Sequence, residues 1–189
     1  MSEKLTADEK RTLLHLAREA LESAVRGEKL APLDLAHYSP LLASAGAAFV
    51  TLTVNSQLRG CVGSLRPAQP LAEDVRENAI SAGLYDRRFR PVRPSELAGI
   101  RIEVSRLTLP QPLAYTDAQD LLAKLRPGLD GVILRDGPNR ATFLPQVWEQ
   151  IPEKAEFLGR LCEKMGAPGQ LWRQKHLDVE IYQVEEFHE

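Results

Sequence analysis

Two short runs joined by a turn, residues 48–54 and 58–65, constrain the fold of this chain more than any other feature. The first run alternates apolar with polar side chains and is rich in β-branched residues, which is typical of a half-buried strand. Residues 55–57 read Asn-Ser-Gln and have turn chemistry, so the second run is predicted to return as another strand. The segment therefore predicts a β-hairpin.

The alternation also predicts the register of this hairpin. Consecutive strand residues point to opposite faces, so a slip by one residue would mix the apolar and polar side chains. The register that separates the two classes pairs Thr53 with Arg59, Thr51 with Cys61 and Phe49 with Gly63. One face then carries Thr51, Thr53, Arg59 and Cys61, and the other face carries the apolar side chains of Val50, Leu52, Val54, Leu58 and Val62.

The second strand of the hairpin holds Cys61 between two glycines, Gly60 and Gly63, and Arg59 precedes it by two positions. A guanidinium beside a thiol favours the thiolate, which is the nucleophilic form, so Arg59 and Cys61 are candidate catalytic residues. Glycine within a strand costs about 0.5–1 kcal/mol relative to alanine, and two glycines here would leave space for a substrate. The alternative is a cysteine that is only a small buried hydrophobe, with glycines that mark a bulge.

The remaining elements predict helices at 6–27, 71–84, 117–125 and 153–165, a strand at 100–107, a second hairpin within 131–144, a helical turn at 145–148 and a last strand at 179–184. Thr6 and Glu9 form a capping box for the first helix, and Gly27 ends it. Cys162 falls on the apolar stripe of the helix at 153–165 and is predicted to lie in the core. These elements predict an α+β fold, with a mixed or antiparallel sheet flanked by helices.

Two further segments are candidates for the site. If the strand at 100–107 joins the hairpin, Glu103 and Ser105 share the face of Cys61 and Thr51, and Glu103 becomes a candidate base. The loop at 85–94 contains four arginines and two prolines, which indicates either a solvated surface or a binding site for an anion. In the second case Asp86, Arg88 and Phe89 would form the rim of the substrate site, with Asp86 holding one guanidinium.

Composition bounds the class of protein. The chain has 189 residues, which suits one domain with at most a small additional lobe, and a net charge of −2 argues against nucleic acid as a partner of the chain as a whole. No signal peptide opens the sequence and no apolar run could span a bilayer, so we expect a cytoplasmic protein. The two cysteines and four histidines show no metal-ligand spacing, so we expect free thiols, no metal site and no cofactor.

The chain resembles the AMMECR domain family, called protein A of the AmmeMemoRadiSam system in prokaryotes, over nearly its whole length. The most specific match is residues 58–63, Leu-Arg-Gly-Cys-Val-Gly, where the family has isoleucine in place of Val62. Asp86 with Arg88 and Phe89 resembles the family's aspartate-proline-arginine-phenylalanine, with Arg87 in place of the proline. Further segments similar to family motifs are residues 102–105, 130–131, 144–147, 157–158 and 161–162.

The resemblance implies a single domain over residues 1–189, with a larger and a smaller lobe. It implies a link to two partners, a Memo-type protein and a radical SAM enzyme, but it does not imply a reaction. Two hypotheses therefore stay open. The chain is either an enzyme that uses the Cys61 thiolate on a small anionic substrate, or a non-catalytic binding or adaptor module for a protein partner, RNA or a metabolite.

Overall fold

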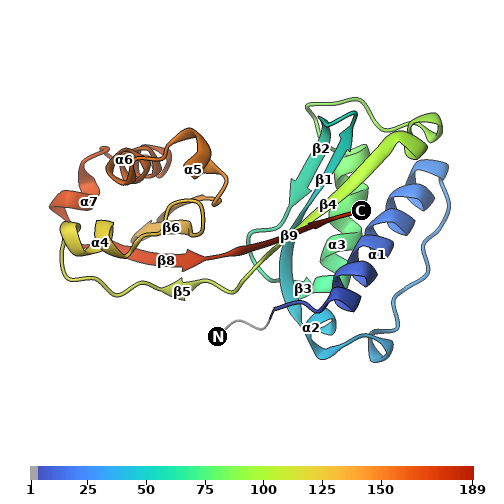
Figure 1. The fold of residues 1–189 in the computed structure, drawn as a ribbon, viewed down its shortest axis with the longest axis horizontal. Helices are drawn as coiled ribbons and strands as arrows, with labels where there is room; N and C mark the ends of the chain where they lie inside the picture. The colour runs from blue at the N-terminus through green and yellow to red at the C-terminus, as the bar shows by residue number, and fades with distance from the viewer. Residues whose placement is uncertain (1–3) are drawn as a thin grey trace. The chain divides into compact units, whose positions relative to one another are not determined.

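The structure is a computed structural model that describes residues 4–189, and the chain forms two compact units. Unit 1 comprises Met1–Thr108 and Glu185–Glu189, and unit 2 comprises Leu109–Val184 (Figure 1). Each unit is built on one antiparallel sheet with helices, so the predicted α+β class is confirmed.

Unit 1 contains a five-stranded sheet in which the order β2-β1-β4-β9 runs from one edge to the other, with β3 paired to one end of β1. Its strands are β1 Ala45–Val54, β2 Gln57–Gly63, β3 Gln69–Pro70, β4 Ile100–Leu107 and β9 Val184–His188. Its helices are α1 Ala7–Arg26, η1 Leu35–His37, α2 Pro40–Ala43, α3 Leu71–Leu84 and η2 Pro94–Gly99. The predicted strand at 100–107 and helix at 71–84 are confirmed with these bounds.

Helices α1 and α3 pack on each other and on one face of this sheet (Figure 1). The first helix has the predicted capping box between Thr6 and Glu9 and ends at Gly27 in the left-handed conformation. The core beneath the helices includes Val50 and Leu52 from β1 and Ile102 and Val104 from β4, all fully buried. Because alternate strand residues face the helices, their neighbours in sequence lie on the opposite, helix-free face.

Unit 2 contains a four-stranded sheet in the order β5-β8-β6-β7. Its strands are β5 Gln111–Pro112, β6 Gly131–Asp136, β7 Asn139–Phe143 and β8 Asp178–Tyr182. Its helices are α4 Ala118–Lys124, α5 Val147–Gln150, α6 Lys154–Lys164 and α7 Leu171–Gln174. The predicted second hairpin is confirmed as β6–β7, and Cys162 lies fully buried in the core of this unit, as predicted.

The first hairpin follows its predicted register only in part. Thr51 pairs with Cys61 and Phe49 pairs with Gly63, as predicted, but Thr53 pairs with Leu58 instead of Arg59. The reason is a β-bulge after Gly60 toward the turn, which inserts one extra residue into β2. As a result Leu58 shares a face with Thr53 and is 45% exposed, so its predicted place on the apolar face is wrong.

Two boundaries also differ from the prediction. The turn of the first hairpin holds two residues, Asn55 and Ser56, both with positive φ, and Gln57 already belongs to β2. This is the geometry of a two-residue type I′ turn, which matches the twist of the strands. The predicted last strand at 179–184 is two strands, because the chain leaves the sheet of unit 2 after Tyr182 and continues as β9 in the sheet of unit 1.

Candidate functional site

Three candidate side chains form a row across the helix-free face of the sheet in unit 1. Thr51 of β1 lies opposite Cys61 of β2 on one side and opposite Glu103 of β4 on the other. Residues in register on adjacent strands point to the same face, so the row runs Cys61, Thr51, Glu103. Adjacent strands are about 4.8 Å apart, which places the Cys61 and Glu103 backbones about 10 Å from each other.

Cys61 is a partly exposed residue, and its sulfur accepts a hydrogen bond from the Thr51 hydroxyl, with 3.3 Å between Oγ1 and Sγ. The pairing geometry explains this contact. The N–H and C=O groups of Cys61 bond away from β1, so Thr51 and Cys61 form a non-hydrogen-bonded pair, in which opposing side chains lie closest. A hydroxyl that donates to sulfur stabilises the thiolate more than the thiol, because its dipole points at the negative charge.

Side chains from the loop after α3 satisfy the free edge of β2 at Cys61. Asp86 Oδ2 accepts the Cys61 N–H at 2.9 Å, and Arg88 Nη2 donates to the Cys61 carbonyl at 3.1 Å. Arg88 also donates to Asp86 through Nε at 3.0 Å and Nη2 at 2.7 Å. The carboxylate and guanidinium thus occupy the positions that a neighbouring strand would fill, and they fix the backbone that carries the thiol.

The electrostatics of this loop follow from its contacts. Hydrogen bonds from Arg88, and then from the Cys61 N–H, hold the pKa of Asp86 far below its usual range, so the carboxylate stays charged. Asp86 is 6% exposed, whereas Arg88 is 57% exposed and its guanidinium lies 5.6 Å from the centre of the Phe89 ring. The Asp86 carboxylate therefore binds the backbone of β2, and the Arg88 guanidinium remains partly exposed to solvent.

The sequence led us to expect a free Arg59 guanidinium beside the thiol, but the structure pairs this guanidinium with a carboxylate. Its Nε donates to Glu96 Oε1 at 2.9 Å and its Nη2 donates to Glu96 Oε2 at 3.2 Å, which links β2 to η2. Hydrogen bonds from Arg59 in turn lower the pKa of Glu96. The bulge that carries Arg59 breaks the two-residue alternation on which its predicted place beside Cys61 rested.

The two glycines are explained by the packing of the protein itself. A Cβ on Gly60 would lie 2.1 Å from the Ala82 carbonyl oxygen of α3, on the helix-covered face. A Cβ on Gly63 would lie 2.3 Å from the ring of Phe49. The space that we expected a substrate to use at these positions is therefore filled, by helix backbone at Gly60 and by an aromatic ring at Gly63.

Glu103 and Ser105 lie on the predicted face but differ in access. Ser105 is opposite Phe49 and is buried, so it faces packed side chains, whereas Glu103 is half-buried. Burial, and then repulsion from Glu186, raises the pKa of Glu103, while His188 acts in the opposite direction. A carboxyl group with a raised pKa accepts a proton at a higher pH than an exposed glutamate, which suits a base.

Sequence reasoning missed a buried polar network that fixes the far ends of β1 and β2. Asp74 of α3 accepts the Ala48 N–H at 2.9 Å and the Ser64 hydroxyl at 2.6 Å, and Asn78 donates to Asp74 at 3.0 Å. Burial raises the pKa of Asp74. The available signal was the spacing: Asp74 and Asn78 are four residues apart on the inward stripe of α3, where polar side chains need partners.

The structure supplies no metal cluster for this site. Among residues 4–189, no group of three or more histidine, cysteine, aspartate or glutamate side chains is arranged to hold a metal ion. Both cysteines are free. None of the helices in the same described range is both long and apolar enough to cross a membrane.

Comparisons with known proteins agree over nearly the whole chain. The family model described as AMMECR1 matches residues 14–187. A protein from Methanothermobacter thermautotrophicus is 40% identical over 188 residues, covering 98% of this chain and 96% of the relative. A protein from Methanopyrus kandleri is 37% identical over 201 residues, covering 100% of this chain and 92% of the relative. The crystal structure of the uncharacterized protein PH0010 from Pyrococcus horikoshii is similar, with a TM-score of 0.81 and 31% identity over 99% of this chain and 94% of that chain.

Proposed function

This chain belongs to the AMMECR1 family, and we propose that it is a cytoplasmic enzyme whose nucleophile is the Cys61 thiolate and whose substrate is a small anion. The observation that carries the proposal is the row of Cys61, Thr51 and Glu103 on a helix-free sheet face. Such a row places a nucleophile, a hydrogen-bond donor to it and a proton acceptor on one accessible surface. The two free thiols suit a reducing compartment.

In this proposal Thr51 prepares the sulfur for attack. Its hydroxyl donates to Sγ, and the Asp86 and Arg88 contacts prevent the backbone of Cys61 from moving. A nucleophile fixed in this way needs little reorganisation before the sulfur forms its bond to an electrophilic carbon of the substrate. Asp86 is a positioning residue, because it touches the Cys61 backbone and not the reacting sulfur.

The charge that attracts an anion is assigned to Arg88. Arg59 is engaged in a bidentate pair with Glu96 and is 16% exposed, so it serves to position β2. Arg88 is largely exposed, and its Nη1 takes no part in the bonds to Asp86 and Cys61. An anionic group that bound Nη1 would lie beside the strand residue that carries the thiol. Phe89 would form the apolar side of this rim.

Glu103 is the proposed proton acceptor, and its distance from Cys61 determines the path of the proton. Because the Cys61 and Glu103 backbones are about 10 Å apart, the thiol proton would travel through a substrate group or a water over Thr51. The raised pKa of Glu103 favours its return of the proton to a leaving group.

The test is the rate of alkylation by iodoacetamide, followed for each cysteine by mass spectrometry between pH 5 and 9. Cys162 is a control in the same molecule, because it is fully buried and burial raises its pKa. We expect Cys61 to react faster than a free model thiol at neutral pH. We expect Thr51→Val to slow Cys61 about two- to tenfold, the equivalent of one hydrogen bond. A Cys61 that reacts no faster than the model thiol would overturn the proposal.

A second candidate function is a binding or adaptor module that acts with Memo-type and radical SAM proteins. The observation that favours it is the exposed loop that holds Tyr85, Arg87, Arg88 and Arg90, in which Tyr85 is 70% exposed. Tyrosine and arginine are the side chains that most often dominate protein interfaces. RNA is a further ligand to test on this basic loop, although the net charge of the whole chain disfavours it.

Charge reversal separates the two candidates. Arg88 also holds the Cys61 backbone, so the docking role is better tested with Arg87→Glu and Arg90→Glu, with Cys61→Ser as the matched chemical variant. An adaptor would lose partner capture with the charge reversals and keep it with Cys61→Ser. An enzyme would lose its biological activity with Cys61→Ser whether or not it captured a partner.

A further inference from the structure

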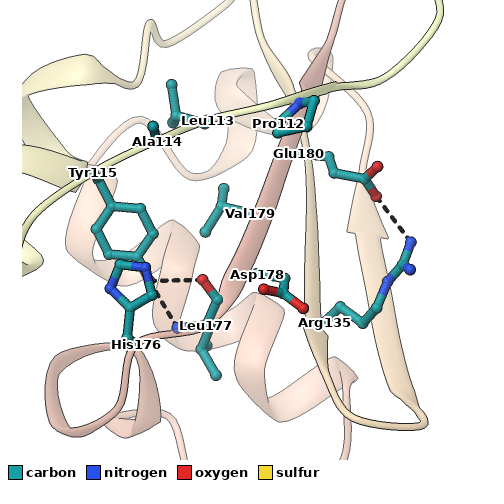
Figure 2. A pocket seen from close by; sticks show the side chains of 10 residues that line it. All are labelled: Pro112, Leu113, Ala114, Tyr115, Arg135, His176, Leu177, Asp178, Val179 and Glu180. Carbon is teal, nitrogen blue, oxygen red and sulfur yellow. Dashed lines mark hydrogen bonds and ion pairs between the residues drawn. The ribbon is translucent and has the colours of Figure 1, made fainter.

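Unit 2 contains a cavity of about 300 Å³ that no part of the Cys61 argument uses (Figure 2). One wall comes from β5 and the segment that follows it, and the other comes from the start of β8 with Arg135 of β6. The segments are held together by the Leu113 N–H, which donates to the Val179 carbonyl at 2.8 Å, and by the pairing of Pro112 with Glu180. The cavity is thus built from paired strands rather than from a loose loop.

Two aromatic rings form one end of the cavity. Tyr115 and His176 stack with 4.1 Å between ring centres and 16° between planes. The Tyr115 hydroxyl donates to the Leu177 carbonyl at 2.9 Å and accepts the Leu177 N–H at 2.8 Å, so the buried tyrosine is locked in place. The histidine ring is the exposed member of the stack and presents an aromatic surface to the cavity.

Acidic side chains form the other end, opposite the rings (Figure 2). Arg135 pairs with Glu180 at 3.0 Å, which satisfies one carboxylate. Asp178 is exposed, and its carboxylate makes no hydrogen bond or ion pair with any residue in the range 4–189. The carboxylate of Asp178, after the larger effect of burial, contributes to raising the pKa of Tyr115, so its field reaches the aromatic end. The carboxylates of Asp178 and Glu180 outnumber the single guanidinium of Arg135, so one carboxylate in the cavity has no partner among the described residues.

We propose that this cavity binds a small alkylammonium ligand, with its charged group between Asp178 and the His176 ring and its alkyl chain along Pro112 and Ala114. An aromatic face and a free carboxylate are the two groups that attract an organic cation, the first through the ring quadrupole and the second through charge. The volume lies at the lower end of the range for small-molecule sites, which fits a ligand of a few carbons and excludes a folded partner. The proposal does not depend on the chemistry of Cys61.

The test is isothermal titration of the full chain with three molecules of equal length. 1,4-Diaminobutane carries the proposed ammonium group at each end of its chain, 1,4-butanediol is its neutral counterpart and succinate is its anionic counterpart. We expect heat of binding for the diamine alone, and weaker binding as ionic strength rises. Binding of succinate in preference to the diamine would assign the cavity to anions through Arg135. Absence of diamine binding at millimolar concentration would overturn the proposal as well.

Variants distinguish the cavity from general attraction of cations to the surface. Asp178→Asn should weaken diamine binding at least about threefold, because one charge-assisted contact is lost. Glu149→Gln removes the same charge from an exposed position of unit 2 outside the cavity and should leave the affinity unchanged. His176→Ala should weaken binding about two- to fivefold, and His176→Phe should restore it, because the aromatic face is the feature required. Equal effects of Asp178→Asn and Glu149→Gln would overturn the proposal.

Discussion

The two hairpins of this protein share a plan and differ in their register, their edges and their turns. In β1–β2 and in β6–β7 the first strand lies inside a sheet and the second lies at its edge, and each pair is joined by a two-residue turn. The β6–β7 register runs without interruption from Val132 opposite Phe143 to Asp136 opposite Asn139. The β1–β2 register is broken by the bulge at Arg59.

The edges of the two hairpins are protected differently. The β7 backbone receives side-chain contacts from Lys164 Nζ, which is exposed and donates to the Thr142 carbonyl at 2.9 Å, and from the Tyr182 hydroxyl, which donates to the Phe143 carbonyl at 3.1 Å. The β2 edge receives the buried carboxylate of Asp86 together with the guanidinium of Arg88, and both bond to a single residue, Cys61. An edge strand needs protection from pairing, but it does not need a buried charge to obtain it. The difference indicates that the position of Cys61 itself is what the first hairpin fixes.

The largest expected effect tests the close approach beneath the first hairpin. In Gly60→Ala the new Cβ would meet the Ala82 carbonyl of α3, which is backbone and cannot rotate away. We expect the free energy of unfolding of unit 1 to fall by about 3 kcal/mol. Both tryptophans, Trp148 and Trp172, lie in unit 2, so tryptophan fluorescence reports that unit, and hydrogen exchange of β1 and β2 peptides reports unit 1.

Gly99→Ala is the matched control for this substitution. A Cβ on Gly99 would have only the Val54 side chain at 4.0 Å as a neighbour, so the change should be neutral or slightly stabilising. Equal losses for Gly60→Ala and Gly99→Ala would show that the contact of α3 with β2 is not the constraint described above.

The next effect tests the edge contacts directly. Asp86→Asn keeps the size of the side chain but removes the charge that accepts bonds from the Cys61 N–H and Arg88. We expect a loss of about 2 kcal/mol in unit 1 at pH 7 and faster exchange of the Cys61 amide. Because the folded pKa of Asp86 lies below its unfolded value, this stabilisation is complete above the unfolded pKa and is lost as the pH falls toward the folded one.

The second hairpin offers the control for Asp86. Asp136 ends β6 and forms an ion pair with Lys175 at 2.6 Å in which the lysine is 55% exposed. Asp136→Asn should cost about 0–1 kcal/mol, because exposed pairs are screened by solvent. If Asp136→Asn lowered the free energy of unfolding as much as Asp86→Asn, the contacts of Asp86 at the β2 edge would stabilise the protein no more than an exposed ion pair does.

The contrast also separates what the sequence could predict from what it could not. Alternation gave the strands and the pairing of Thr51 with Cys61, because burial of one face dictates the register locally. The glycines left a bulge open as one interpretation, but its position at Arg59 was not predictable, since α3 approaches at Gly60 and Arg59 bonds to Glu96, both distant in sequence. The residue types of the site were visible in the chain, but their partners were set by the fold.

The last two strands also show that a local sequence pattern does not predict tertiary pairing. A single last strand was predicted at 179–184, whereas the pairing of β8 with β6 in one unit and of β9 with β4 in the other divides residues 178–188 into two strands. The Asp86 and Arg88 contacts were predicted as a rim for substrate, and their bonds to the Cys61 backbone depend on the loop after α3 reaching the β2 edge. Local patterns carry no record of such tertiary approaches.

A smaller effect compares the two turns. Ser56, the second residue of its turn, has φ of 62°, in the left-handed region that disfavours side chains, whereas the positive φ of the second turn, 58°, falls on its first residue, Gly137. Ser56→Gly should therefore stabilise unit 1 by about 0.5–1 kcal/mol, and Gly137→Ser should destabilise unit 2 by a similar amount. Urea unfolding, with fluorescence for unit 2 and hydrogen exchange for unit 1, measures both. A loss on Ser56→Gly would show that the serine side chain has a role in the first turn.

The smallest effect concerns one glutamate on the strand next to each hairpin, Glu180 on β8 and Glu103 on β4. Glu180 is paired with Arg135, so Glu180→Gln should be neutral or cost up to about 1 kcal/mol at pH 7.

Burial and Glu186 raise the pKa of Glu103, so the folded chain binds this proton more tightly than the unfolded chain does. Stability then falls as the pH rises from the unfolded pKa, about 4.3, through the raised folded pKa. Glu103→Gln removes this fall, so the variant should gain on the wild type in unit 1 between pH 4 and pH 7, by hydrogen exchange of β4 peptides. A variant that instead loses ground over this range would mean that the Glu103 carboxylate is stabilised in the fold, and it could then not serve as the base beside Cys61.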